Sequence, residues 1–201
     1  MPNYQLEMEK QLAAVTDREQ PPRLLLHSCC APCSSYVLEY LSRYFAITVY
    51  YDNPNIFPKE EFDKRAAEQK RLIDELPTVH PVNLIVTDYD SDLFFAMAKG
   101  LENEPEGGAR CEKCYRLRME HTARAAKEQG FDYFTTTLSI SPLKNAAKLN
   151  AIGEELAAQY GVAYLCADFK KKNGYLRSIE LSREYALYRQ DHCGCVYSQR
   201  K

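Results

Sequence analysis

The sequence contains no apolar run that approaches the roughly 20 residues needed to cross a bilayer. Residues 1–20 are polar, carry four acidic side chains and lack the apolar core of a signal peptide. Both absences favour a cytoplasmic protein with no membrane partner. No internal repeat or low-complexity linker divides the rest, so we expect an N-terminal extension over residues 1–20 and a single domain over residues 21–201.

An excess of basic charge is also lacking. The 26 lysines and arginines against 28 acids give a net charge of −2, and the sequence isoelectric point is about 6.1. This balance excludes a positive field over the whole surface of the kind that holds nucleic acid. It leaves RNA open as a partner, provided that the basic surface is local.

Cysteine is too sparse for a disulfide scaffold, with eight residues in 201. A chain of this length can bury a sizeable core and does not need such a scaffold. Thiols stay reduced in the cytoplasm, so clustered cysteines there favour metal or redox chemistry.

What the sequence does contain is an alternation of short apolar runs and amphipathic helical patterns. It predicts an α/β fold, with an open, mainly parallel five-stranded sheet flanked by helices and a C-terminal helical extension. Residues 88–110 are less regular, and we expect their second half to be a loop that delivers Cys111. The predicted strands lie at 24–26, 47–51, 84–86, 133–136 and 163–165, and the helices near 32–41, 60–76, 115–129, 149–160 and 178–188.

Polar and sulfur-bearing residues follow three of these strands. Ligands bind open parallel sheets beyond the carboxyl ends of the strands, so we expect these turns to converge on one site. They contain Cys29, Cys30 and Cys33 after the first strand, Asp52, Asn53 and Asn55 after the second, and Cys166 and Asp168 after the fifth.

Seven of the eight cysteines form three groups, Cys29-Cys30-x-x-Cys33, Cys111-x-x-Cys114 and Cys193-x-Cys195. One structural zinc ion would use four and leave three clustered cysteines unused. A four-cysteine [4Fe–4S] cluster plus a three-ligand metal uses all seven and leaves an open coordination position, as catalytic metals require. Cys166 stands alone in an apolar context, where we expect a small buried hydrophobe.

Two other functions stay open at this point. Cys29, Cys30 and Cys33 could form a thiol redox centre without metal. The cysteine groups could also hold zinc in a non-catalytic module that interacts with tRNA. His27 and His192 flank cysteine groups, and we expect both to be structural or to support ligands.

Several longer motifs resemble the QueH family of epoxyqueuosine reductases, and they occur in order between residues 24 and 198. They are Leu-Leu-His-Ser-Cys-Cys-Ala-Pro-Cys-Ser at 25–34, Asn-Pro-Asn-Ile at 53–56, Cys-Glu-Lys-Cys-Tyr-Arg-Leu-Arg at 111–118, Thr-Leu-Ser-Ile-Ser-Pro at 137–142, Asp-Phe-Lys-Lys at 168–171, Ser-Arg-Glu at 182–184, Tyr-Arg-Gln at 188–190 and Cys-Gly-Cys-Val-Tyr-Ser at 193–198.

The resemblance implies a specific reaction. QueH enzymes carry out the last step of queuosine biosynthesis, removing the epoxide oxygen from epoxyqueuosine at the wobble position of tRNAs with GUN anticodons. These are the tRNAs for aspartate, asparagine, histidine and tyrosine. The family works without cobalamin and is associated with a [4Fe–4S] cluster beside a mononuclear iron. An external electron donor must supply electrons through the cluster. Its fold looks like the HUP class of PP-loop enzymes, which places a QueH-like catalytic domain at residues 21–201.

These expectations assign roles to individual residues. Cys33 is a candidate ligand of the mononuclear metal, and Asp168, Tyr115 and His27 are candidate proton donors. The candidates to contact tRNA phosphates are basic residues 170–172, Arg177, Arg183 and Arg189, which Arg116, Arg118, Lys144 and Lys148 could join. The candidate metal ligands are Cys29, Cys30, Cys33, Cys111, Cys114, Cys193 and Cys195; the candidate cofactor-binding residues are Cys30, Cys111, Cys114, Cys193 and Cys195; and the candidate catalytic residues are Cys29, Cys30, Cys33 and Asp168.

Overall fold

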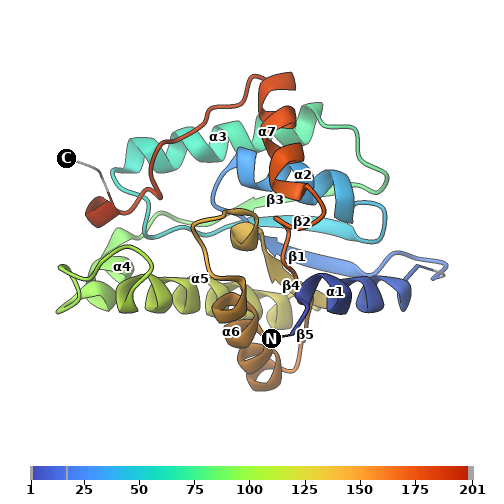
Figure 1. Cartoon of the computed structure of the whole chain (residues 1–201), viewed down its shortest axis with the longest axis horizontal. Coiled ribbons are helices and arrows are strands. Elements are labelled where there is room, and N and C mark those ends of the chain that lie inside the picture. Colours follow the sequence, from blue (N-terminus) through green and yellow to red (C-terminus); the bar gives the residue numbers. More distant parts are fainter. Residues whose placement is uncertain (1, 17, 199–201) are drawn as a thin grey trace.

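A five-stranded parallel sheet forms the centre of the computed structural model, which describes residues 2–16 and 18–198 (Figure 1). The strand order is β3-β2-β1-β4-β5, and every neighbouring pair is parallel. The predicted fold class is therefore confirmed. Residues 199–201, the end of the expected catalytic domain, lie outside the described residues. The strands are β1 (Arg23–His27), β2 (Ala46–Tyr51), β3 (Val82–Val86), β4 (Tyr133–Thr136) and β5 (Ala163–Tyr164).

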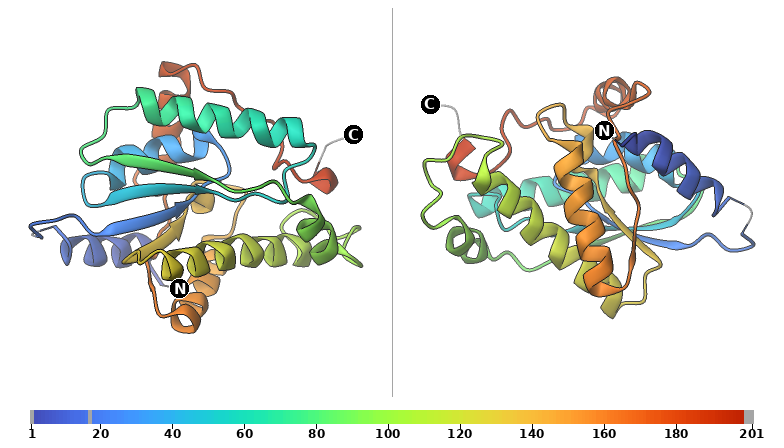
Figure 2. Two further views of the ribbon diagram at one scale, coloured as in Figure 1. Left: turned by 180° about the vertical axis from the view of Figure 1, so that it is seen from behind. Right: turned by 60° about the horizontal axis from the view of Figure 1, so that its bottom comes forward.

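Helices cover both faces of the sheet, with α3 and α5 on opposite sides (Figure 2). Alternation along β1 explains this arrangement: Leu24 and Leu26 point into one apolar cluster, and Leu25 points into the other. The helices are α1 (Tyr4–Ala13), α2 (Ala31–Leu41), α3 (Lys59–Glu75), α4 (Ser91–Ala98), α5 (Ala109–Glu128), α6 (Ala146–Tyr160) and α7 (Gly174–Glu184), with short 3₁₀ helices η1 (Thr137–Ile140) and η2 (Val196–Ser198).

Helices α4, α7 and α1 differ from the predicted pattern. Helix α4 occupies the first half of the irregular region, where the side chain of Asp90 caps it by accepting a hydrogen bond from the amide of Asp92. The loop expected before Cys111 is confirmed between α4 and α5. Helix α7 begins and ends four residues earlier than predicted. It stops at Glu184 because the chain turns at Ala186, with φ of +46°, and buries Leu187.

Helix α1 was not predicted because its apolar stripe is only two buried residues wide, Met8 and Leu12. Its N-terminus is capped by Asn3, whose side chain accepts a hydrogen bond from the amide of Leu6. The helix packs beside β5, where the side-chain amide of Gln11 bonds to the backbone. Its Nε2 donates to the carbonyl of Tyr164, and its Oε1 accepts from the amide of Cys166, just after the strand.

The order of the strands fixes where a ligand can bind. From β1 the chain runs to β2 and then β3 on one side of the sheet, and after β3 it crosses back to β4 on the other side of β1. The carboxyl ends of β1 and β4 therefore frame a crevice, the usual ligand position in an open α/β sheet. Among the described residues, no helix combines the length and hydrophobicity that a bilayer span requires.

Candidate metal centre

The turn between β1 and α2 holds the first cysteine group in a rigid frame. Cys30 is the N-cap residue of α2, with extended backbone, and a proline stands in the first helical turn. The buried hydroxyls of Ser28 and Ser34 both donate to Oε1 of Gln69 on α3. Nδ2 of Asn53 donates to the carbonyl of Ser28 at 2.8 Å, which confirms that the turns after β1 and β2 meet.

The sulfur atoms of Cys29, Cys30 and Cys33 all lie within 4.8 Å of one another. Those of Cys29 and Cys30 are 3.8 Å apart. Thiolates bound at about 2.3 Å to one tetrahedral ion have their sulfurs about 3.8 Å apart, so this triad suits a single metal with one position left open. Within residues 2–16 and 18–198, it is the one group of three or more potential ligands that is this tight.

Hydrogen bonds inside the triad favour one thiolate. The neighbouring thiols of Cys30 and Cys33 hold the pKa of Cys29 well below its ordinary value, and the positive charges of Arg118 and Lys144 act in the same direction. Burial, together with the charge beside it, raises the pKa of Cys30 to about 12. The triad therefore already stabilises one negative sulfur, which is the ligand form of cysteine.

The other four clustered cysteines line a separate cavity. Cys111 and Cys114 lie in the first turns of α5, and Cys193 and Cys195 face them from the C-terminal segment. The backbone amide of Gly107 points to the sulfur of Cys111 at 3.3 Å. Four cysteines around one space are a donor set that an iron–sulfur cluster or a zinc ion can use. Their sulfurs are spread more widely than the triad, as a multi-iron group would need.

The loop that carries Cys193 and Cys195 is fixed from behind by α3. Nη1 of Arg65 donates to the carbonyl of Cys193 at 3.2 Å, and Nε of the same arginine pairs with Glu61 at 2.6 Å. The amide of Phe57 donates to the carbonyl of Gly194 at 2.9 Å. Arg65 is 1% exposed, so this segment is anchored by a buried charge rather than by surface contacts.

Two further cations face the cysteines. Arg118 is fully buried, and its Nη2 has no hydrogen-bond partner among the described residues. Burial lowers the pKa of Arg118, but the thiolates of Cys114 and Cys193 outweigh this and raise it overall. Nζ of Lys144 lies 3.6 Å from the sulfur of Cys193. A buried cation with an unused N–H group next to four cysteine sulfurs fits an anionic cluster.

Another cavity lies between the two cysteine groups. Its walls include Cys29 and Cys33 from the triad and Cys193 from the group of four, with Lys144 between them. It opens at the crevice framed by β1 and β4, where ligands of such sheets bind. Both potential metal groups thus border one space that a substrate could enter.

The three candidate proton donors lie in different surroundings. His27 is fully buried; its Nε2 must donate to the carbonyl of Asp52, so Nδ1 accepts from the hydroxyl of Thr136 at 2.9 Å. Burial lowers its pKa to about 4. His27 is therefore a neutral structural residue, as expected for its position beside the cysteines. Tyr115 is buried and borders the cavity of the four cysteines.

Asp168 does not border the cysteine cavities. It forms an ion pair with Lys170 at 2.5 Å and faces a neighbouring hollow, whose wall is shared with the cysteine cavity at Lys144. The turn after β5 therefore reaches the site only through that lysine. Cys166 is 8% exposed, packs in an apolar cluster and contacts Glu154, which confirms it as a buried hydrophobe.

The prediction that Arg118 contacts tRNA phosphates is wrong, because Arg118 is inaccessible. The side chains of Arg118 and Lys144 both face cysteine sulfurs. A signal for Arg118 existed, because it follows Cys114 by four residues and so shares its helix face. The role of Arg65 left no such signal, since 128 residues separate it from Cys193.

Comparison with known proteins identifies the family of this chain. Residues 24–201 match the family model described as Epoxyqueuosine reductase QueH. The chain is 45% identical over 199 residues to the protein of that name from Streptococcus pyogenes, covering 98% of this chain and 78% of the relative. It is 43% identical to the one from Staphylococcus epidermidis, covering 99% and 85%, and 32% identical to the one from Thermotoga maritima, covering 87% and 89%. On this evidence of shared sequence over nearly its whole length, the chain belongs to the epoxyqueuosine reductase QueH family.

Proposed function

We propose that this protein is a cobalamin-independent epoxyqueuosine reductase, which converts epoxyqueuosine to queuosine in tRNA with GUN anticodons in the cytoplasm. The observation that carries this proposal is the cavity bordered by Cys29, Cys33 and Cys193, because it brings two separate sulfur groups to one substrate-sized opening. The names of the relatives support the same reaction.

The geometry supports a division of the seven cysteines that the sequence left open. We assign a [4Fe–4S] cluster to the group of four and a mononuclear iron to the triad, with Cys33 among its ligands. When bound, these centres would supply single electrons and a Lewis-acidic position. The ligands of the two groups are as follows: Cys111, Cys114, Cys193 and Cys195 for the cluster, and Cys29, Cys30 and Cys33 for the iron.

The reaction consumes two electrons and two protons, and it gives an alkene and water. An external reductant must supply the electrons. For the proton, Lys144 is the group that the chain itself presents to the cavity: the thiolate of Cys193 helps to raise its pKa, so its ammonium is charged at neutral pH. Asp168, the donor expected from the sequence, is paired with Lys170 in the neighbouring hollow and does not border this cavity.

Fewer basic residues can contact tRNA phosphates than the sequence suggests. Several of the predicted phosphate contacts are occupied in ion pairs: Lys170 with Asp168, Lys172 with Glu9, Arg177 with Glu39, Arg116 with Glu155 and Lys148 with Glu112. In the part of the chain that the structure describes, Lys171, Arg183 and Arg189 carry no such pair. We propose that Arg189 makes the main electrostatic contact with the anticodon arm and that Lys171 and Arg183 contribute less.

Anaerobic reconstitution with iron and sulfide, followed by assay on tRNA containing epoxyqueuosine, tests the proposal. We expect about five iron atoms per chain, four in the cluster and one in the triad, and conversion to queuosine under a strong reductant. Cys30→Ala should abolish turnover while keeping the iron–sulfur absorbance. Cys166→Ala, which removes the eighth cysteine, should match wild type.

The same measurements separate the alternatives. Zinc alone, without conversion, would indicate a zinc module that interacts with tRNA. Turnover by a metal-free protein would indicate a thiol redox enzyme. Iron loading without any conversion under a strong reductant would contradict the reductase.

A further inference from the structure

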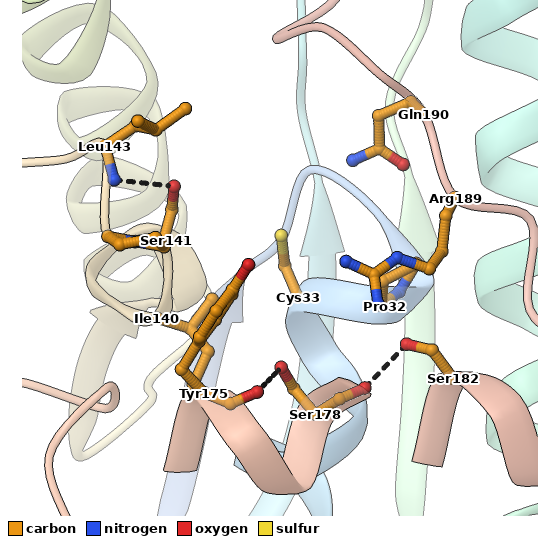
Figure 3. Close-up of a pocket in the computed structure, with 11 residues that line it drawn as sticks. Pro32, Cys33, Ile140, Ser141, Leu143, Tyr175, Ser178, Ser182, Arg189 and Gln190 are labelled. Carbon is orange, nitrogen blue, oxygen red and sulfur yellow. Dashed lines mark hydrogen bonds between the residues drawn. The ribbon is translucent and has the colours of Figure 1, made fainter. Parts of the chain in front are cut away.

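A further cavity, the outer cavity, borders Cys33 of the triad and measures about 160 Å³ (Figure 3). It shares Cys33, Ser141 and Gln190 with the cavity that joins the two cysteine groups, so the two spaces adjoin. A ligand that fills both would have one end at the sulfurs and the other at the surface.

The walls of this outer cavity come from three segments that meet at the crevice between β1 and β4. In Figure 3, Cys33 points up between the segment after η1 on one side and the segment after α7 on the other. Leu143 and Tyr175 form its rim, and they are 70% and 37% exposed. Exposed apolar and aromatic side chains at the mouth of a cavity suit the flat face of a base.

Two polar groups in the cavity have no partner within the described residues. The guanidinium of Arg189 points inward over the cavity and forms no ion pair there. Oε1 of Gln190 is buried and accepts no hydrogen bond, although the same side chain reaches the sulfur of Cys30. A buried carbonyl oxygen without a donor is costly, so a ligand with an N–H group at this position would relieve the cost.

The hydroxyl of Ser141 accepts a hydrogen bond from the amide of Leu143 at 3.3 Å, which leaves its proton free to donate. The cavity therefore offers one cation, one acceptor, one donor and an aromatic rim. A guanine-type nucleotide matches this set, because it has a phosphate, N–H donors, a carbonyl oxygen and a planar base.

We propose that the outer cavity binds the wobble nucleotide itself, turned out of the anticodon loop. Arg189 binds its phosphate, Tyr175 stacks on its base and Gln190 accepts a hydrogen bond from the base edge, so that the modified group extends past Cys33 to the metal ligands. This inference rests on the proposed function, and it identifies the residues that select the nucleotide.

The test measures binding, by fluorescence anisotropy, of a labelled anticodon stem-loop RNA with guanine at the wobble position to the anaerobically reconstituted protein. Arg189→Gln should raise Kd about tenfold and reduce the slope of log K against log salt by about 0.7. Arg183→Gln is the matched control, because it also removes one positive charge but lies on α7, outside the cavity. It should raise Kd only about twofold.

Tyr175→Ala should raise Kd about tenfold, and Tyr175→Phe should bind as wild type, because the stacking ring is kept. The base itself is tested with an RNA that has an abasic wobble position, on which Tyr175→Ala should have no effect. Both tyrosine and arginine variants change exposed side chains, so iron content and melting temperature should match wild type.

Equal effects of Arg189→Gln and Arg183→Gln, or a Tyr175→Ala effect that persists on the abasic RNA, would overturn this assignment of the cavity. A wild-type protein that binds the stem-loop as described but never converts epoxyqueuosine would refute the reductase function instead. The two failures are therefore distinguishable.

Discussion

Replacing Gly194 by alanine should release the iron–sulfur cluster while leaving the fold in place. Gly194 has φ of +101°, and a Cβ atom there would lie 3.0 Å from Cγ1 of Ile56 and 3.1 Å from Nη1 of Arg65. Neither neighbour can yield easily: Ile56 is fully buried, and Arg65 is held by Glu61. The loop must therefore move, and with it the two cysteines on either side of Gly194.

The expected size follows from these contacts. The left-handed backbone alone costs a non-glycine residue about 1–2 kcal/mol, and displacement of the packed loop adds about 1–3 kcal/mol. For a chain of this size, each kcal/mol lowers Tm by about 2–4 °C. We expect Tm to fall by about 4–20 °C, and iron to fall from about five atoms per chain toward the single atom of the triad.

Iron analysis, iron–sulfur absorbance and thermal melting of the reconstituted protein measure these effects. Gly100→Ala is the matched control, because Gly100 has φ of +81° and an added Cβ would meet no atom within 4 Å. It should share the backbone strain and keep all the iron. A Gly194→Ala protein that retains full cluster content would show that the loop tolerates the shift, and the anchoring role given to Arg65 would then be wrong.

Three further substitutions test other parts of the structure. Arg65→Met leaves the largely buried carboxylate of Glu61 without its ion-pair partner, with the Tyr188 hydroxyl as its remaining side-chain donor, and should cost about 3–5 kcal/mol in urea unfolding; a loss below 1 kcal/mol would contradict a buried anchor. Arg118→Met removes a buried cation beside the group of four cysteines, so the cluster should become harder to reduce and its midpoint potential should fall, as redox titration would show; an unchanged potential would refute this electrostatic role. Gly153→Ala places a Cβ 2.3 Å from the ring of Tyr164 and should destabilise by about 1–3 kcal/mol without loss of iron; a simultaneous loss of iron would show that α6 is coupled to the site.

The strands could be predicted because each is a short apolar run, and its burial in a parallel sheet requires that pattern. The cysteine groups could be predicted for a similar reason, since two-residue spacing and helix starts are local features of the sequence. The division into a triad and a group of four could not, because Cys111 and Cys193 meet only through the tertiary fold.

Charged residues explain most of the remaining differences. Lysine and arginine are usually exposed, and nothing local in the sequence indicates that Arg65 is buried. The burial of Arg65 and Arg118 is offset by carbonyl and sulfur atoms elsewhere in the chain. Asp168 was selected as a catalytic candidate by its place after a strand, and its ion pair with Lys170 depends on side-chain directions that periodicity does not give.

The side-chain amide of Gln11 has a consequence for solubility. The outer edge of β5 would otherwise present unpaired backbone groups, and such edges recruit strands from other molecules. Because Gln11 offers one donor and one acceptor to this edge, at 3.0 Å each, it takes the place of a neighbouring peptide group. Helix α1, which precedes the part of the chain matched by the family model, thereby shields the sheet from self-association.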